Sequence, residues 1–204
     1  MISLAIQAGG QSQRMGEDKA LKLFLGRPLV QRVVDRLTPL ADEVLLTTNH
    51  PERYGFLGIR LVPDLIPGLG PLGGLYTALA SASYPTVAIV ACDLPFASAA
   101  LLEQAAKTLV EQDADIVIPR TIKGLEPLHA VYRRSTCLPV VRSAIQKGQL
   151  KVIDWFPLVR VREQPPQEVN QLDPSGLTFW NINTPEDFKE AENLYRDHQK
   201  REIK

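Results

Sequence analysis

Short apolar runs alternate along the chain with longer segments in which apolar residues recur every three or four positions. The runs rich in Val, Ile and Leu, each predicted to form a strand, are Ile2–Ile6, Glu43–Thr48, Ile59–Val62, Thr86–Ala91 and Asp115–Pro119. Segments with helical spacing separate these runs. The pattern therefore predicts βαβ units around a mostly parallel sheet.

Turn and capping residues indicate where the helices lie. Pro28 suits the first position of a helix whose apolar stripe includes Leu29, Val33 and Leu37 and which stops at Pro39. The other predicted helices are Pro71–Ala82, a helix from the N-cap Ser98 to about Gln112, Thr136–Lys147, and a final helix from Pro185 behind the cap Thr184.

The regular alternation of predicted strands and helices ends after Pro119. Lys123-Gly124 predicts a turn, and Ala130–Tyr132 is expected to return as an antiparallel strand. The Pro- and Gln-rich stretch Glu163–Leu172 is expected to be an irregular surface loop, and a last strand is expected to end at Asn181–Thr184. The predicted fold is α/β: a single three-layer domain, 1–204, with a mostly parallel sheet carrying one antiparallel strand.

The composition of the chain limits the classes of binding partner that we expect. The 204 residues carry 23 Lys and Arg against 23 Asp and Glu, so the net charge favours neither a nucleic acid nor an anionic membrane as partner. Met1–Ala8 is apolar but too short for a signal sequence or a membrane span, which indicates a cytoplasmic protein. Cys92 and Cys137 lie far apart and suggest neither a disulfide framework nor a zinc site.

The segment Ile6–Lys19 combines a strand end with three glycines, at positions 9, 10 and 16, and two cationic side chains, Arg14 and Lys19. Glycines let backbone N–H groups approach an anion, and Arg and Lys add full positive charge. The segment is expected to hold a phosphate chain, although it matches neither the P-loop nor the dinucleotide fingerprint. The alternative is a glycine-rich turn that serves packing alone.

Three polar residues follow strands, where α/β sheets bind ligands. Asp93 follows an apolar strand and is expected to hold Mg²⁺ against phosphates; the alternative, a helix cap, is weaker because Ser98 lies closer to the helix start. Its charge is expected to be costly in the free protein until the metal binds. Asn49 and Asp64 follow two other strands, and Asp64 is either an ordinary turn residue or an acceptor for nucleotide hydroxyls or base edges.

Two further patches indicate a second ligand: Glu126–His129, which leads into the returning strand, and Asn181–Thr184. Asn181 and Asn183 precede the final helix and suit a phosphate-bearing, hydrogen-bond-rich molecule, or form an Asx turn before the cap. His129 is the one candidate base in its region, and a structural role is favoured because nothing pairs it with a nucleophile.

Residues Ala8–Leu21, Ala-Gly-Gly-x-Ser-x-Arg-Met-Gly-x-Asp-Lys-Ala-Leu, resemble the signature loop of the nucleotidyltransferases and are most similar to the molybdenum cofactor guanylyltransferase family. The resemblance implies a Rossmann-like nucleotidyltransferase fold. It also implies transfer of GMP from Mg·GTP to the terminal phosphate of molybdenum-bound molybdopterin, with release of pyrophosphate. Residues of about 1–96 would bind GTP and about 97–204 the acceptor. Implied partners are GTP, molybdenum-molybdopterin, and molybdopterin-supplying proteins or molybdoenzyme chaperones.

The resemblance also implies residue roles. Arg14, Lys19 and Asp93 would be catalytic, with Asp93 the metal ligand. The implied binding residues are Gln7, Ala8, Gly9, Gly10, Ser12, Lys19, Thr47, Asn49, Asp64, Gly73, Asp93, Asn181 and Asn183. The family's nucleotide-contacting asparagine aligns near Thr47, two positions before Asn49, so either residue could make that contact.

Other functions remain open. A related cytidylyl- or sugar-phosphate nucleotidyltransferase is the nearest alternative, but those relatives typically have Ala-Ala-Gly where this chain has Ala8-Gly9-Gly10. A nucleotide-binding regulatory module would not need Arg14, Lys19 and Asp93 together. A dehydrogenase is disfavoured by the glycine spacing.

Overall fold

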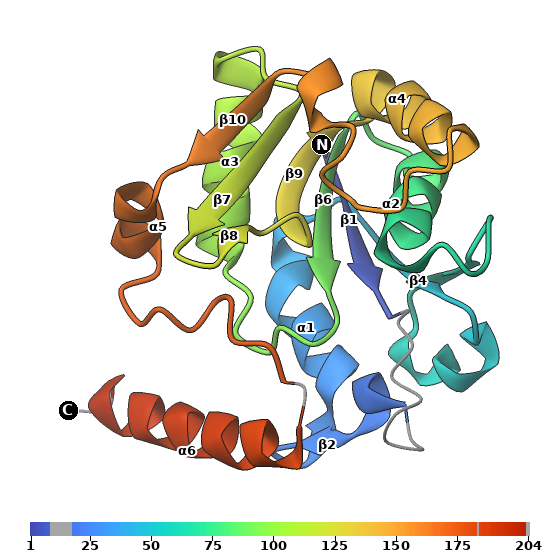
Figure 1. Cartoon of the computed structure of the whole chain (residues 1–204). Helices are drawn as coiled ribbons and strands as arrows, with labels where there is room; N and C mark the ends of the chain where they lie inside the picture. The colour runs from blue at the N-terminus through green and yellow to red at the C-terminus, as the bar shows by residue number, and fades with distance from the viewer. Residues whose placement is uncertain (9–17, 183, 203–204) are drawn as a thin grey trace.

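The computed structural model of the chain describes residues 1–8, 18–182 and 184–202, which form an α/β fold (Figure 1). The strands of its main sheet are β1 (Ile2–Gln7), β4 (Glu43–Thr48), β5 (Arg60–Pro63), β6 (Thr86–Ala91), β7 (Ile116–Thr121), β8 (Gly124–Leu125), β9 (His129–Arg133) and β10 (Val161–Gln164). Their order is β10-β7-β9-β6-β1-β4-β5, and β8 pairs with β7.

The sheet is mostly parallel, as the alternating pattern predicts. β1 pairs in parallel with both β4 and β6, and β10 pairs in parallel with β7. The returning strand β9 is antiparallel to β6 and to β7, and it lies between them in the interior of the sheet. The short strand β8 is a second antiparallel strand beyond the one expected.

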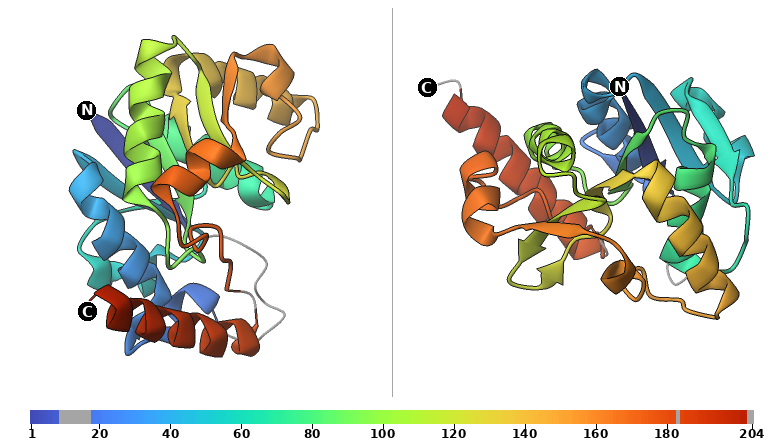
Figure 2. Two further views of the ribbon diagram at one scale, coloured as in Figure 1. Left: turned by 90° about the vertical axis from the view of Figure 1, so that its left-hand side faces the viewer. Right: turned by 90° about the horizontal axis from the view of Figure 1, so that it is seen from above.

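Helices cover both faces of the sheet, so three layers result (Figure 2). α1 (Leu29–Leu37) and α3 (Ala99–Glu111) bury apolar side chains against one face, where Leu4, Ile6 and Val90 belong to the same core cluster. α2 (Gly70–Ser81) and α4 (Arg134–Gln146) cover the other face. Short 3-10 helices lie at Lys19–Leu21, Thr38–Leu40, Pro51–Arg53, Gly55–Leu57 and Phe156–Leu158.

The predicted caps are confirmed. The Ser98 side chain accepts a hydrogen bond from the Leu101 N–H at the start of α3. At the start of α6 (Pro185–Glu202), the Asp187 N–H donates to Thr184 Oγ1 while the Thr184 N–H donates to Asp187 Oδ2. Gly148 follows α4 with a φ of 75°, which suits a helix stop.

The C-terminal helix α6 packs on the hairpin of β2 (Leu23–Phe24) and β3 (Arg27–Pro28), apart from the two main core layers (Figure 1). A third apolar cluster joins them: Phe24, Leu29, Phe96, Ile182 and Ala191. The Leu25 N–H donates to Glu192 Oε1 at 3.0 Å. The C-terminal helix therefore packs against the elements that follow β1 in the sequence.

Three local expectations are wrong. The stretch Glu163–Leu172 is ordered structure, containing the end of β10 and α5 (Pro166–Leu172), because its prolines start a helix and its glutamine Gln164 is buried opposite Pro119. Among the described residues 173–182 no strand precedes α6. Pro28 pairs with Leu23 in the hairpin and caps α1, which begins one residue later.

Candidate functional site

Lys19 and Asp93 meet at the carboxyl ends of β1 and β6. Lys19 Nζ lies 2.9 Å from Asp93 Oδ2, and the side chains are 12% and 26% exposed. The pair joins the first 3-10 helix to the loop after β6, 74 residues apart in sequence. This contact corrects the expectation that the Asp93 charge is offset only when the metal binds, since Lys19 already offsets it.

The loop from Asp93 to Ser98 is held at three points. The Ile182 N–H donates to the Asp93 carbonyl at 3.1 Å, and Arg36 Nε donates to the Ala97 carbonyl at 2.7 Å. The Ser98 N–H donates to His129 Nε2 at 3.1 Å. α1, β9 and the C-terminal segment thus all fix the position of the candidate metal ligand.

His129 is buried, and burial lowers its pKa to about 4. Its imidazole is therefore neutral at pH 7, with Nε2 as the acceptor for the Ser98 N–H and the proton on Nδ1. Among the described residues Nδ1 has no hydrogen-bond partner. These contacts give His129 a structural place under the Asp93 loop, as the sequence favours.

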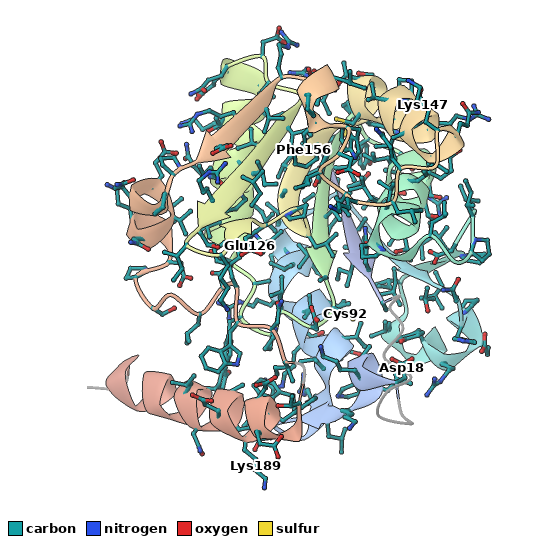
Figure 3. All side chains as sticks on the ribbon, viewed as in Figure 1. Asp18, Cys92, Glu126, Lys147, Phe156 and Lys189 are labelled. Carbon is teal, nitrogen blue, oxygen red and sulfur yellow. The ribbon has the colours of Figure 1, made fainter. Side chains whose placement is uncertain are left out.

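Asp18 and Tyr54 position Lys19 from the other side. The Tyr54 hydroxyl donates to Asp18 Oδ2 at 2.6 Å, Arg53 Nη1 lies 3.3 Å from the same oxygen, and Asp18 Oδ1 accepts from the Ala20 N–H. Burial, with the bond to Asp18, raises the pKa of Tyr54, so the phenol stays protonated. In Figure 3 Asp18 and Cys92 lie toward the same end of the molecule. The sequence analysis did not predict this support, although Asp18, directly before Lys19 in the signature loop, is the signal that could have indicated it.

The opposite side of the β1 end is formed by uncharged groups and one carboxylate. Gln7 and Thr47 are adjacent in the β1–β4 register, and both are buried. The Ala8 N–H donates to the Thr47 carbonyl at 2.9 Å. Asn49 is exposed, and its side chain bonds to the half-buried Asp64, whose pKa burial raises and this bond partly lowers.

Glycines let α2 approach this region closely. A Cβ on Gly73 would lie 3.0 Å from Leu69 Cβ and 3.1 Å from the Ile66 carbonyl. A Cβ on Gly74 would lie 2.8 Å from Gln7 Oε1. The N-terminal turns of α2 therefore pack against both the loop that follows Asp64 and the end of β1.

The structure brings most of the described candidates to one end of the sheet. Asn181 is exposed and precedes Ile182, whose N–H donates to the Asp93 carbonyl, so the segment before α6 reaches the loop that carries Asp93. The candidates Gly9, Gly10, Ser12, Arg14 and Asn183 lie outside the described residues.

The carboxylate of Asp93 suits a magnesium ion that is shared with a phosphate. Mg²⁺ is usually held by one or two carboxylates together with substrate phosphates and waters. Within the part of the chain that the structure describes, no group of three or more His, Cys, Asp or Glu side chains could hold a metal ion. A single carboxylate at the strand end fits a metal ion whose other ligands are nucleotide phosphates and waters.

This arrangement defines an α/β enzyme of the nucleotidyltransferase class: a mostly parallel sheet, a glycine-rich segment after the first strand, and a Lys–Asp pair at the strand ends. The chain belongs to the MobA-like NTP transferase domain family, whose model matches residues 4–161. Nucleotidyltransferases of this kind generally use a divalent metal.

Similar proteins carry more specific names. A probable molybdenum cofactor guanylyltransferase of Pelotomaculum thermopropionicum is 38% identical over 189 residues, covering 91% of this chain and 89% of its own. A molybdenum cofactor guanylyltransferase of Desulfosudis oleivorans is 35% identical, covering 92% of both chains.

Solved structures agree on the fold. Molybdopterin-guanine dinucleotide biosynthesis protein A from Archaeoglobus fulgidus superposes with a TM-score of 0.83 at 26% identity, covering 96% of this chain and 99% of its own. A 2-C-methyl-D-erythritol 4-phosphate cytidylyltransferase from Thermus thermophilus shares the fold at 20% identity, with a TM-score of 0.65 and coverage of 95% and 98%. Among the described residues, no helix is long and apolar enough to cross a membrane.

Proposed function

We propose that this protein is a molybdenum cofactor guanylyltransferase. It transfers GMP from Mg·GTP to the terminal phosphate of molybdenum-molybdopterin, giving the guanine dinucleotide form and pyrophosphate. The observation that carries the proposal is the 2.9 Å pair of Lys19 and Asp93 at the carboxyl ends of β1 and β6. Relatives at 38% and 35% identity with this name support the choice of substrates.

The chemistry needs no protein nucleophile, because the acceptor phosphate is already anionic. Cys92 lies beside the pair, but burial raises the pKa of its thiol, as does the adjacent Asp93 charge, so the reactive thiolate is not formed at neutral pH. His129 is buried and bonded to the Ser98 N–H. Catalysis then depends on positioning and on neutralising charge.

Lys19 supplies a cation to the triphosphate as negative charge moves onto pyrophosphate. Asp93 would hold Mg²⁺, which when bound neutralises phosphate charge and polarises the α-phosphate. The ion pair keeps both side chains in place before substrate arrives, and the Asp18–Tyr54 bond fixes the 3-10 helix that carries Lys19. Arg14 would add a second cation from the signature loop.

Each of two parts of the chain binds one of the two substrates. Residues of about 1–96 bind GTP, through the Gly9–Gly10 loop and Ser12 for phosphates and through Asp64 with Thr47 or Asn49 for the nucleoside. Residues of about 97–204 bind the pterin acceptor, with Asn181 and Asn183 as contacts. We expect the enzyme to act in the cytoplasm.

An end-point assay tests the function. The protein is incubated with each nucleoside triphosphate, Mg²⁺ and molybdenum-molybdopterin, and the dinucleotide product is identified; the guanine dinucleotide is expected. In parallel, GTP with Mg²⁺ should raise the melting temperature more than CTP or UTP does, because binding to the folded state alone stabilises it. Equal shifts with all three would contradict the guanine assignment, and a larger shift with CTP would favour a cytidylyltransferase.

A further inference from the structure

The side chain of Gln7 is polar, yet it is buried at the end of β1. Gln7 is 5% exposed. Within the described part of the chain its Nε2 atom has no hydrogen-bond partner. A buried donor without a partner is destabilising, so such a group is retained in a fold most simply when a ligand completes it.

The position of Gln7 places this donor at the centre of the nucleotide site. In the sheet register Gln7 pairs with Ala91 on one side and with Thr47 on the other. Its own carbonyl accepts from the Cys92 N–H at 3.0 Å, directly before Asp93. The Gln7 main chain thus lies between the strand that leads to Asp93 and the strand that leads to Asn49.

Gly74 determines where the carboxamide lies. A Cβ at position 74 would come within 2.8 Å of Gln7 Oε1 and 3.0 Å of Gln7 Cδ, closer than real Cβ contacts. The carboxamide therefore occupies the space that the glycine leaves against α2. Packed between β1 and α2, it is oriented before any ligand binds.

The charges at this end of the sheet indicate which part of a nucleotide reaches Gln7. Lys19 and Asp93 attract the phosphates and their metal ion, and their ion pair lies at the loop that follows β6. On the β4 side the described side chains at the strand ends are the uncharged Thr47 and Asn49, followed by Asp64 after β5. A nucleotide with its phosphates at Lys19 would place its base over the β1–β4 end, next to α2.

We propose that the Gln7 side chain is a specificity-determining contact, which donates its Nε2–H to the carbonyl oxygen of the nucleotide base, with Gly74 as its positioning residue. Guanine presents the O6 acceptor on the edge where adenine presents an amino donor, so an amide donor favours guanine. This inference rests on the proposed use of GTP. It goes further in naming the side chain that selects the base.

Base analogues test the contact directly on the full-length protein. Affinities for GTP, ITP and 2-aminopurine riboside triphosphate are measured by calorimetry with Mg²⁺; the first two carry O6 and the third does not. The parent should bind GTP and ITP more tightly than the 2-aminopurine analogue. Gln7→Leu should weaken GTP and ITP about 5- to 150-fold, the range for one good base contact, and leave the analogue unchanged.

Thermal stability separates a ligand role from a structural one. Since Gln7→Leu removes a buried donor that has no partner among the described residues, its melting temperature should equal or exceed that of the parent. A clear fall in melting temperature, or an unchanged ratio of GTP to analogue affinity, would overturn the proposal. Loss of GTP binding or of guanylyl transfer in the parent itself would instead overturn the proposed function.

A second variant tests whether Gly74 positions the Gln7 carboxamide. Gly74→Ala should displace the carboxamide without unfolding the chain, because the atom it meets is the far end of a flexible side chain. It should reduce the preference for GTP over the 2-aminopurine analogue. Gly55→Ala is the matched control, since a Cβ there meets nothing within 4 Å. Equal base preference in both glycine variants would contradict the positioning role.

Discussion

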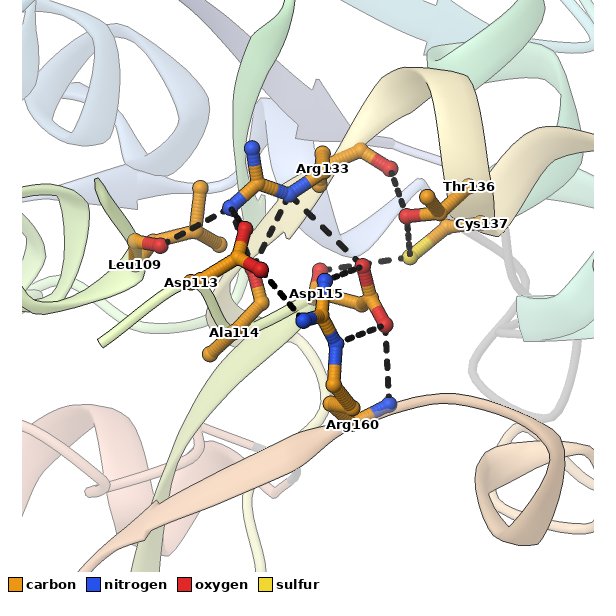
Figure 4. A network of polar contacts seen from close by, with 8 residues as sticks. All are labelled: Leu109, Asp113, Ala114, Asp115, Arg133, Thr136, Cys137 and Arg160. Atoms are coloured by element: carbon orange, nitrogen blue, oxygen red, sulfur yellow. Dashed lines mark hydrogen bonds and ion pairs between the residues drawn. The ribbon is translucent and has the colours of Figure 1, made fainter. Parts of the chain in front are cut away.

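Charged side chains gather at opposite ends of the central sheet, and the two groups are built differently. At the amino ends of β7 and β10, Asp113, Asp115, Arg133 and Arg160 form a network that includes main-chain carbonyls (Figure 4). At the carboxyl ends of β1 and β6, Lys19 and Asp93 form an ion pair, and Nε2 of the neighbouring Gln7 has no hydrogen-bond partner among the described residues.

The members of the network at the amino end bind mainly one another. Asp115 Oδ2 accepts from the Arg160 N–H at 2.9 Å and from Arg160 Nε at 3.3 Å. Arg133 donates to the carbonyls of Ala114 and Leu109, and both arginines bind Asp113. Burial opposes ionisation of Asp115, but the bonds from Arg160 hold its pKa below the usual value. These contacts join β10 to β7 and to the end of β9.

The comparison separates structure from function. A charged cluster whose members bind mainly one another and main-chain carbonyls serves to hold strands together. A group whose polar atoms are matched only in part gains from a ligand that completes it. The following changes test this distinction, from the largest expected effect to the smallest.

Asp93→Asn removes the carboxylate that is proposed to hold the metal ion at the carboxyl end. We expect guanylyl transfer to fall by about 10³-fold or more, because a neutral amide is a poor ligand for Mg²⁺. Since Lys19 loses an ion pair that is partly exposed, the melting temperature should change by only a few degrees. Asp35→Asn, at an exposed position, is the control for the loss of a carboxylate. Normal turnover in Asp93→Asn would place the metal site elsewhere.

Lys19→Met removes the cation of the same pair. Turnover should fall by about 10²-fold, the scale of one preorganised group at developing charge, while the fold persists. Lys107→Met, which affects only an exposed pair with Glu111, should retain full activity. Single-turnover kinetics at saturating GTP measure the effect, and equal rates for the two variants would give the signature loop a packing role alone.

The pH dependence of stability tests His129, which lies under the Asp93 loop. Its folded pKa of about 4 lies below the unfolded value, so the unfolded state binds the extra proton first as the pH falls. Stability from this residue is complete above about pH 6.5 and is lost as the pH falls toward 4, by at most about 3 kcal/mol. Urea unfolding at pH 7 and pH 4.5 measures it. His129→Gln keeps an acceptor for the Ser98 N–H and should flatten that dependence; an equal slope in both proteins would contradict the assignment.

Asp115→Ala removes the buried carboxylate of the network at the amino end. It should lower the free energy of unfolding by about 2 kcal/mol, because charged hydrogen bonds to Arg160 are lost and Arg160 is largely exposed. For a chain of this length that corresponds to a fall of about 4–8 °C in melting temperature. Turnover at 25 °C should remain that of the parent. A loss of activity larger than the loss of folded protein would show that the two ends of the sheet are coupled.

The sequence by itself determined much of the fold and part of the site. The strands Glu43–Thr48 and Thr86–Ala91 agree with the structure at both ends, since their apolar runs are bounded by polar and turn residues. Local caps such as Ser98 and Thr184 were readable because a cap and its helix are neighbours in the chain. The positions of Lys19 and Asp93 followed from the rule that ligand-binding residues lie after parallel strands.

Only the tertiary structure decided the contacts between distant segments. The place of β9 between β6 and β7, the support of Ser98 by His129, and the fit of Gln7 against Gly74 each join residues that are far apart in the chain. Residue type and spacing cannot reveal such pairs, because they depend on how layers pack once the sheet has formed. The same reason explains why the loop prediction for Glu163–Leu172 is wrong. The polar composition of this segment is typical of a loop, whereas pairing with β7 makes its first part a strand and buries Gln164.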